Sequence, residues 1–344
     1  MKIDAWCFEN KQKDDEILQA EFCMPKTHLG IYAELEKITY PFIISVSAKK
    51  ENAKIYCREF EVNCQKETTE LFEITCNDCA FVFKSITEGA IGSPDEINVE
   101  ITVGERSYAE TIKCEYARIC GKITDFEGNP YPAVVEFSRI AFDSEYANIA
   151  VWSNKNGEYS IAVPKGRYNK IYVCDSGYGK NVLENWSWNM LLDRDEEHNF
   201  KIGNGEVYSL SPWCNNGGGP TMFFWFRPMI LPSIKEENYE AEINGVKRNV
   251  NDISPELEVP DIKVTLNGTD LKVISLQKVY ETGNDYAMPG YIVQTERPYK
   301  ASDTIGKQTV IVEYNTKDRI KDYTAQSQGR TQFYFNDFFA LTLR

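Results

Sequence analysis

The sequence predicts an all-β protein built from consecutive β-sandwich domains. Aromatic residues make up 13 % of the chain, and aromatic and β-branched side chains fit the pleated, half-buried surface of a strand. Short apolar runs also recur at the spacing of sandwich strands. In one of them Ile97, Val99, Ile101 and Val103 alternate with polar residues, which places the apolar side chains on one face. Glycine-containing turns separate the runs.

The chain length predicts more than one domain. A chain of 344 residues exceeds what one β-sandwich needs. We expect an N-terminal β-sandwich over residues 1–115, a central β-sandwich with a tryptophan-rich extension over 116–232 (the extension being 177–232), and a C-terminal β-domain over 233–344. Within the first domain the expected strands are 41–48, 54–64, 71–76, 81–85, 97–103 and 107–114.

The central domain carries an ordered set of turn glycines and tyrosines. Gly121-x-Ile-x-Asp-x-x-Gly-x-Pro130 is followed by Ala133-x-Val135, then Asn156-Gly-x-Tyr-Ser-Ile161, then Val163-Pro-x-Gly-x-Tyr168. The Asn-Gly pair predicts a hairpin there, since this dipeptide suits a two-residue turn. The series resembles the carboxypeptidase regulatory-like domain, a transthyretin-like seven-stranded sandwich, over residues 118–174.

The resemblance implies a fold and an appended, non-catalytic module. Domains of that family stand beside peptidases, transporters and surface proteins. The chain has two histidines, His28 and His198, and neither opens an H-x-x-E spacing, so no zinc-peptidase signature is present. We therefore expect no peptidase activity, because function must be argued from a site and not from a fold.

The remaining segments also predict strands. Met222 to Phe226 is continuously apolar, which predicts a strand buried on both faces. In the third domain Asn244-Gly245 and Asn267-Gly268 each stand between strand-like runs and predict hairpins.

Charge and cysteine usage narrow the classes of partner. The net charge is -14, from 52 acidic and 38 basic residues, and such a surface repels nucleic acid and anionic lipid. No run is long enough for a membrane span, and no signal peptide is visible. The ten cysteines stand mostly within strand-like runs, which favours free thiols and a cytoplasmic protein. Secretion remains open.

The tryptophan-rich extension holds the candidate ligand site. Trp186 and Trp188 lie two residues apart, so they share one face of a strand. Two coplanar indoles would make a platform for the apolar face of a sugar ring. The other candidate ligand-binding residues are Asn185, Asn189, Asp193 and Trp213. The other interpretation of the pair is packing between domains, where indoles bury a large area equally well.

An acidic cluster follows the two tryptophans. Asp193, Asp195, Glu196, Glu197 and His198 offer oxygen ligands for a hard cation, but they lack the spacing of a calcium loop, and a solvated turn is the interpretation we prefer. We predict no metal site, no cofactor and no catalytic residue.

These observations leave three functional hypotheses. The first is a non-catalytic binding protein with carbohydrate as the favoured ligand. The second is a scaffold whose partner is another protein. The third is a hydrolase, because the many carboxylates could contain a catalytic pair that the sequence does not single out.

Overall fold

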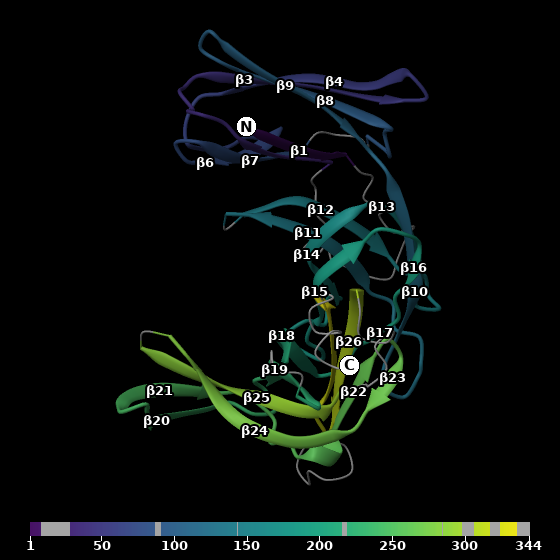
Figure 1. Ribbon diagram of the computed structural model, residues 1–344, viewed down its shortest axis with the longest axis vertical. Helices are drawn as coiled ribbons and strands as arrows, with labels where there is room; N and C mark the ends of the chain where they lie inside the picture. The colour runs from purple at the N-terminus through teal and green to yellow at the C-terminus, as the bar shows by residue number, and fades with distance from the viewer. Residues whose placement is uncertain are drawn as a thin grey trace.

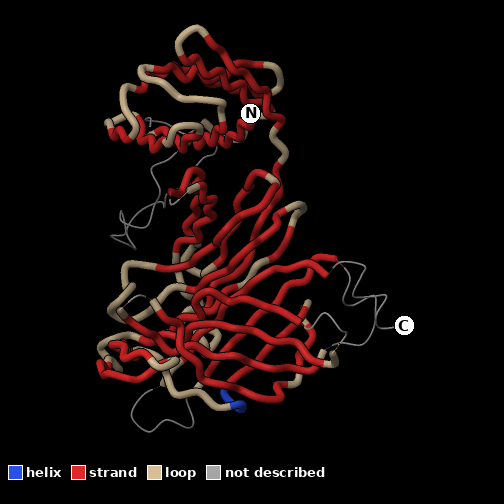
Figure 2. Tube along the Cα trace, turned by 60° about the vertical axis from the view of Figure 1, so that its left-hand side comes forward, coloured by secondary structure: helices blue, strands red, loops and turns tan. Residues whose placement is uncertain are grey.

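The computed structural model describes residues 1–7, 28–86, 91–142, 144–214, 219–283, 285–297, 306–316 and 324–335. Among these residues the regular structure is β-strand apart from one 3₁₀ turn, η1 (Val259–Asp261), the blue segment of Figure 2. The prediction of an all-β fold is confirmed. The N-terminal strands lie at the top of Figure 1, and the C-terminal sheets lie at the bottom.

The N-terminal part is a sandwich of two antiparallel sheets. The first sheet has the order β1-β2-β7-β6-β5, with the bounds Lys2–Cys7, Leu29–Glu34, Ala80–Ser85, Phe72–Cys76 and Lys66–Thr68. The second has the order β4-β3-β8-β9, with the bounds Ala53–Val62, Phe42–Lys50, Glu96–Val103 and Arg106–Lys113. On β8, Ile97, Val99 and Ile101 are buried in the core between the sheets, and Glu100 is exposed. The predicted alternation along this strand is confirmed.

The central part is a second sandwich. One layer contains β13, β10 and β16, with β17 also paired to β10; their bounds are Glu158–Pro164, Tyr116–Thr124, Glu196–Glu197 and Phe200–Lys201. The facing layer contains β12, β11, β14 and β15, with the bounds Ser144–Trp152, Val134–Ala141, Gly166–Cys174 and Asn185–Leu192. The core between them also takes in Trp6 and Val82 from the N-terminal sandwich. The two sandwiches therefore share buried apolar surface.

The Asn156-Gly157 turn joins two layers. It follows β12, which pairs with β11, and it precedes β13, which pairs with β10 in the facing sheet. The predicted hairpin is therefore wrong. Gly157 has φ +75, and a Cβ atom on it would lie 2.2 Å from the backbone oxygen of Ile123. The glycine serves a tight turn packed against β10, which the dipeptide alone does not distinguish from a hairpin turn.

The layer of β12, β11, β14 and β15 extends into the C-terminal part as one eight-stranded sheet. Strand β15 pairs in parallel with β27, with Trp186 opposite Gly329 and Trp188 opposite Thr331. Beyond β27 the sheet continues through β26, β22 and β23. The bounds of β27, β26, β22 and β23 are Gln326–Phe335, Gly306–Asn315, Ile262–Leu266 and Thr269–Leu271.

A last sheet packs against the C-terminal half of this eight-stranded sheet. Its order is β18-β19-β25-β21-β20, and β24 pairs with the other edge of β25. The bounds are Gly205–Cys214, Thr221–Ile230, Tyr286–Glu296, Val246–Asp252, Glu237–Ile243 and Val273–Thr282. The hairpins predicted at Asn244-Gly245 and Asn267-Gly268 are confirmed, and all four residues have positive φ. In Figure 1, β20, β21 and β24 form an arm that extends to one side.

Strand β19 is buried on one face. Met222, Phe224 and Phe226 lie in the C-terminal core, whereas Phe223 and Trp225 are partly exposed. The prediction of burial on both faces is wrong, because Phe223 and Trp225 point out of the core and pack against side chains and backbone of the same sheet. Phe223 stacks on Trp213, and Trp225 covers Gly290.

The nine cysteines in the described residues are free thiols, Cys76 and Cys79 among them. Cys23, the tenth cysteine, lies outside the described residues. In the part of the chain that the structure covers, no helix has the length and apolar character needed to cross a membrane.

Candidate functional site

Trp186 and Trp188 meet on one face of β15. Their ring centroids are 5.0 Å apart and their planes differ by 14°. Both side chains are partly buried. The indoles are stacked on each other and are not coplanar, so each covers part of the other's face. Side chains two residues apart on one strand face can lean together in this way and bury apolar area.

Two tyrosines complete this cluster. Tyr172 on β14 lies opposite Trp186 in the sheet, with 5.3 Å between ring centroids. Tyr208 on β18 meets both indoles edge-on, at 5.7 Å from Trp186 and 5.2 Å from Trp188. All four rings are partly exposed. We call Tyr172, Trp186, Trp188 and Tyr208 the aromatic face.

A buried carboxyl group adjoins the aromatic face on β11. Glu136 is 3 % exposed and accepts hydrogen bonds from the Tyr172 hydroxyl at 2.6 Å, the Ser138 hydroxyl at 2.9 Å and the Asn148 amide at 3.1 Å. Burial disfavours the charged form and raises the pKa of Glu136 to about 7, although the Tyr172 hydrogen bond acts in the opposite direction. The hydroxyl of Tyr172 is therefore fixed by a group that titrates near neutrality.

A cation lies over the same rings. The Lys170 ammonium group is 5.4 Å from the Trp186 centroid and 5.5 Å from the Tyr172 centroid, which is within the range of cation–π attraction. Lys170 also forms an ion pair with Glu145. The Glu145 carboxylate and the Lys170 ammonium group thus lie beside the indoles and can form hydrogen bonds there.

Further charged groups lie close to Tyr208 on the aromatic face. The guanidinium of Arg227 lies 4.5 Å from the Tyr208 centroid and bonds Glu281 at 2.8 Å. The carboxyl of Glu206 is buried, and burial together with the neighbouring Glu184 raises its pKa well above the usual range. Aromatic faces with a few fixed polar groups are typical of ligand sites, and raised carboxyl pKa values cluster at such sites.

The other four predicted site residues lie elsewhere. Asn185 is 2 % exposed on the opposite face of β15, where its amide donates to the Lys201 carbonyl oxygen at 2.9 Å. Asn189 is exposed at a left-handed position of β15. Asp193 is exposed and pairs with Lys307 at 2.9 Å. Trp213 stacks on Phe223 near the end of β18. Of the six candidates, the structure brings together only Trp186 and Trp188.

The residues that sequence reasoning missed are Tyr172, Tyr208, Glu136 and Lys170. Tyr172 and Lys170 lie opposite Trp186 and Trp188 in the register of β14 and β15. The period-two rule places Lys170 and Tyr172 on one strand face, but only the strand pairing places that face beside the indoles.

The acidic stretch after β15 forms an ion-pair cluster. Glu196 accepts from Lys307 at 2.5 Å and meets His198 Nε2 at 3.0 Å. Burial alone would raise the pKa of Glu196, but these two contacts lower it to about 2. Burial lowers the pKa of His198. Within the described ranges, no three His, Cys, Asp or Glu side chains are arranged to hold a metal ion.

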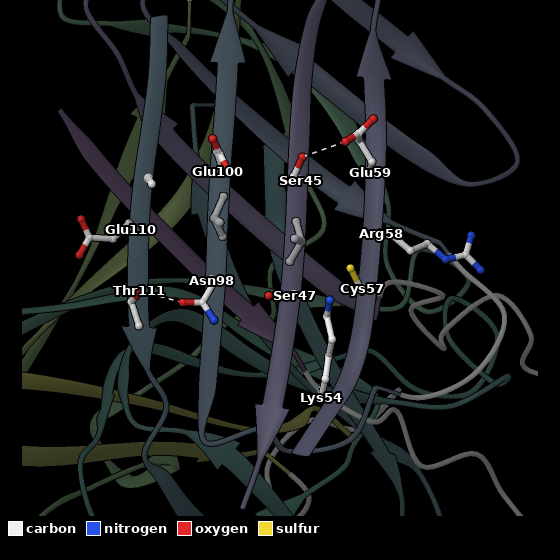
Figure 3. A pocket seen from close by; sticks show the side chains of 13 residues that line it. Ser45, Ser47, Lys54, Cys57, Arg58, Glu59, Asn98, Glu100, Glu110 and Thr111 are labelled. Carbon is white, nitrogen blue, oxygen red and sulfur yellow. Dashed lines mark hydrogen bonds between the residues drawn. The ribbon is translucent and has the colours of Figure 1, made fainter. Parts of the chain in front are cut away.

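A separate trough of about 430 Å³ lies on the outer face of the second N-terminal sheet (Figure 3). Ser45 and Ser47 on β3 lie along its middle, between longer side chains. Ser45 donates to Glu59 at 3.2 Å, and Thr111 donates to Asn98 at 2.7 Å. These two hydrogen bonds join polar groups within the trough, and none of the described residues that line it is aromatic. The trough therefore has the character of an ordinary solvated sheet face, and the aromatic face is the better candidate site.

Comparison of the sequence with known protein families finds no family model that matches, and comparison with curated proteins finds no matching relative.

Proposed function

We propose that the protein is a non-catalytic binding protein and that its aromatic face binds carbohydrate. The carrying observation is the stacked, partly exposed pair Trp186 and Trp188 with Tyr172 and Tyr208 beside them. Ring faces and edges offer apolar contact to the C–H groups of a sugar. In this proposal the central sandwich is the carboxypeptidase regulatory-like module that its turn motifs resemble, and it acts as the support of the site.

Polar groups beside the rings supply the hydrogen bonds that a hydroxylated ligand needs. Glu145 and Lys170 form an ion pair at the edge of the cluster, and Glu136 holds the hydroxyl of Tyr172 in place. A hydroxyl held by an existing hydrogen bond loses less freedom when a ligand binds, which favours affinity. The eight-stranded sheet carries most of these side chains, so the site rests on rigid elements.

A glycan array tests the proposal, with intrinsic tryptophan fluorescence as the second measurement. We expect Trp186→Ala to weaken glycan binding by about tenfold, because removing a central aromatic anchor is usually costly. Trp186 is the better target than Trp188, since Trp188 also packs against the C-terminal core. Trp213→Ala is the matched control, because Trp213 is 42 % exposed and stacks on Phe223 of its own sheet, not on the aromatic face. Absence of binding to plant, host and bacterial glycans would overturn the proposal.

A protein-binding scaffold is the second candidate, favoured by exposed apolar side chains on the arm of the last sheet. Those side chains are Tyr239, Val246, Ile274, Tyr280 and Tyr286. Exposed apolar patches mark interaction surfaces. This candidate would gain if glycan binding were absent and if analytical ultracentrifugation showed self-association that Tyr286→Ser abolished.

A further inference from the structure

A pocket of about 450 Å³ lies where the N-terminal sandwich and the central sandwich meet. Strand β1 of the first sandwich contributes Lys2 and Asp4 to its lining. Strands β11, β12, β14 and β15 of the central sandwich contribute further residues, among them Arg139, Tyr146, Arg167 and the amides Asn169 and Asn189. A volume of this size suits a small molecule. The pocket is separate from the aromatic face, which uses none of these residues.

One wall of the pocket is a neutralised ion pair. Asp4 accepts from Arg139 at 2.8 Å and from the Tyr146 hydroxyl at 3.1 Å. The Arg139 guanidinium lies over the Trp6 ring, 4.1 Å from its centroid, and its side chain is 13 % exposed. Asp4 therefore adds little net negative charge to the pocket, because its partner is fixed and close.

Two further cations line the pocket without an acidic partner. Lys2 lies 5.4 Å from the Tyr32 ring centroid, and Arg167 lies 5.5 Å from that of Tyr334. Within the described part of the chain, neither forms an ion pair with a carboxylate. The protein has 52 acidic and 38 basic residues. Because Arg139 pairs with Asp4, the carboxylate in the lining, Lys2 and Arg167 make the pocket a local positive site on an acidic molecule.

Two amides add neutral hydrogen-bond donors. Asn169 and Asn189 are exposed and lie between the pairs Tyr168 with Met190 and Lys170 with Trp188 of β14 and β15. Asn189 has φ +56, a left-handed conformation that asparagine adopts more readily than most residues.

We propose that this pocket binds the oxyanion group, carboxylate or phosphate, of a small polar molecule. Lys2 and Arg167 supply the positive charge, and Asn169 and Asn189 supply neutral donors. A guanidinium can bond an oxyanion through two parallel N–H groups, which gives geometric selectivity as well as attraction. Because both sandwiches line the pocket, the bound molecule also stabilises their interface.

Isothermal titration of the full chain with sodium phosphate and with sodium glucuronate tests the proposal. Glucose and sodium chloride at matched ionic strength are the reference titrations. We expect saturable binding of at least one of the two anions and a rise in melting temperature with its concentration. Binding of phosphate alone assigns a phosphorylated ligand, and binding of glucuronate alone assigns a carboxylate.

Variants separate the pocket from general charge effects. Arg167→Gln should weaken anion binding about tenfold, and Lys2→Gln should weaken it several-fold. Asn189→Gly keeps a residue that tolerates the left-handed backbone and should weaken binding about threefold. Lys155→Gln is the matched control, since Lys155 is exposed and does not line the pocket. The proposal is overturned if neither anion binds more than chloride does, or if Arg167→Gln and Lys155→Gln bind the anion equally well.

Discussion

Glu136 is a carboxyl group held in a mostly apolar part of the sheet. Its β11 neighbour Val134 is fully buried on the same strand face, and Ala150 on β12 and Cys174 on β14 pack with Val134. Three protein donors bond Glu136, yet burial raises its pKa to about 7. Between about pH 4.5 and pH 7, Glu136 is therefore protonated in the folded protein and ionised in the unfolded chain.

Glu136→Gln should change how stability depends on pH. An acid whose pKa is higher in the folded state favours folding at low pH, and this contribution is lost as the pH rises from about 4.5 to about 7. The glutamine side chain of the variant does not titrate, so the variant keeps its free energy of unfolding while that of the natural protein falls. Between pH 5 and pH 8 the difference, variant minus natural protein, should therefore rise by up to about 3 kcal/mol. Urea unfolding at both pH values measures this difference. Glu110→Gln, on the exposed strand β9, is the control and should leave the two profiles parallel. Parallel profiles for Glu136→Gln would contradict the expectation.

Residue patterns predicted part of the candidate site. The period-two rule places Trp186 and Trp188 on one face, and they do meet there. The same rule places Asn185 and Ser187 on the opposite face, where both are buried, so Asn185 could have been separated from the indoles by the sequence alone. Tyr208 could not have been added, because its approach depends on how β18 crosses the eight-stranded sheet.

Turn signals predicted elements better than they predicted partners. Asn244-Gly245 and Asn267-Gly268 join strands that pair with each other. Asn156-Gly157 ends one strand and starts the next in the same local manner, but its strands belong to facing layers. A turn fixes the local reversal of the chain, and the burial of side chains on both strands decides which sheet each one joins.

Strand β16 is held to the neighbouring β26 by Lys307, and Lys307→Met tests that link. Lys307 is 12 % exposed and pairs with Glu196, which is 15 % exposed. Removing the cation leaves a partly buried carboxylate with fewer partners, so we expect a loss of about 1–3 kcal/mol at pH 7. The pKa of Glu196 is lowered to about 2, so its ionised form stabilises the fold above about pH 4.5 and this contribution fades as the pH falls towards 2. The gap between variant and natural protein should therefore narrow in acid.

Urea unfolding at pH 7 and at pH 3 measures both parts of this expectation. Lys165→Met is the matched control, because it breaks an exposed ion pair with Glu115 and should cost less than about 1 kcal/mol. Equal losses for the two variants at pH 7 would show that the Lys307 contacts do not anchor β16.

The whole molecule depends on pairings between distant segments. Strand β15 pairs with β27 in parallel, so the central sandwich and the C-terminal part share one sheet. Strands β18 and β19, within the residues predicted as the extension of the central domain, pair with each other, and β19 pairs with β25. Composition and alternation predict strands, but they do not encode which of many similar edges will pair. The all-β class was therefore predictable from the composition, whereas the order of the strands in each sheet was not.

The contact between the N-terminal and central sandwiches depends on Gly30. A Cβ atom there would lie 1.5 Å from the Tyr146 backbone oxygen, so β2 and β12 could not keep their present distance with any side chain at this position. The same interface holds the Asp4–Arg139 ion pair and the contact between the Tyr32 and Tyr146 rings, whose centroids are 5.9 Å apart.

Gly30→Ala should therefore loosen the N-terminal sandwich from the rest of the molecule. We expect faster proteolysis at the connection between β9 and β10, and a separate early transition in urea unfolding, because the interface residues lose their partners together.

Gly245→Ala is the control: its Cβ atom meets nothing within 4 Å and its φ is +76, so only backbone strain of about 1 kcal/mol is expected. If Gly30→Ala were cleaved at the natural rate and unfolded in one transition, the two sandwiches would not be coupled through this contact. Faster cleavage of Gly30→Ala than of Gly245→Ala would instead locate the coupling at the β2–β12 approach, since both variants add one methyl group to a glycine.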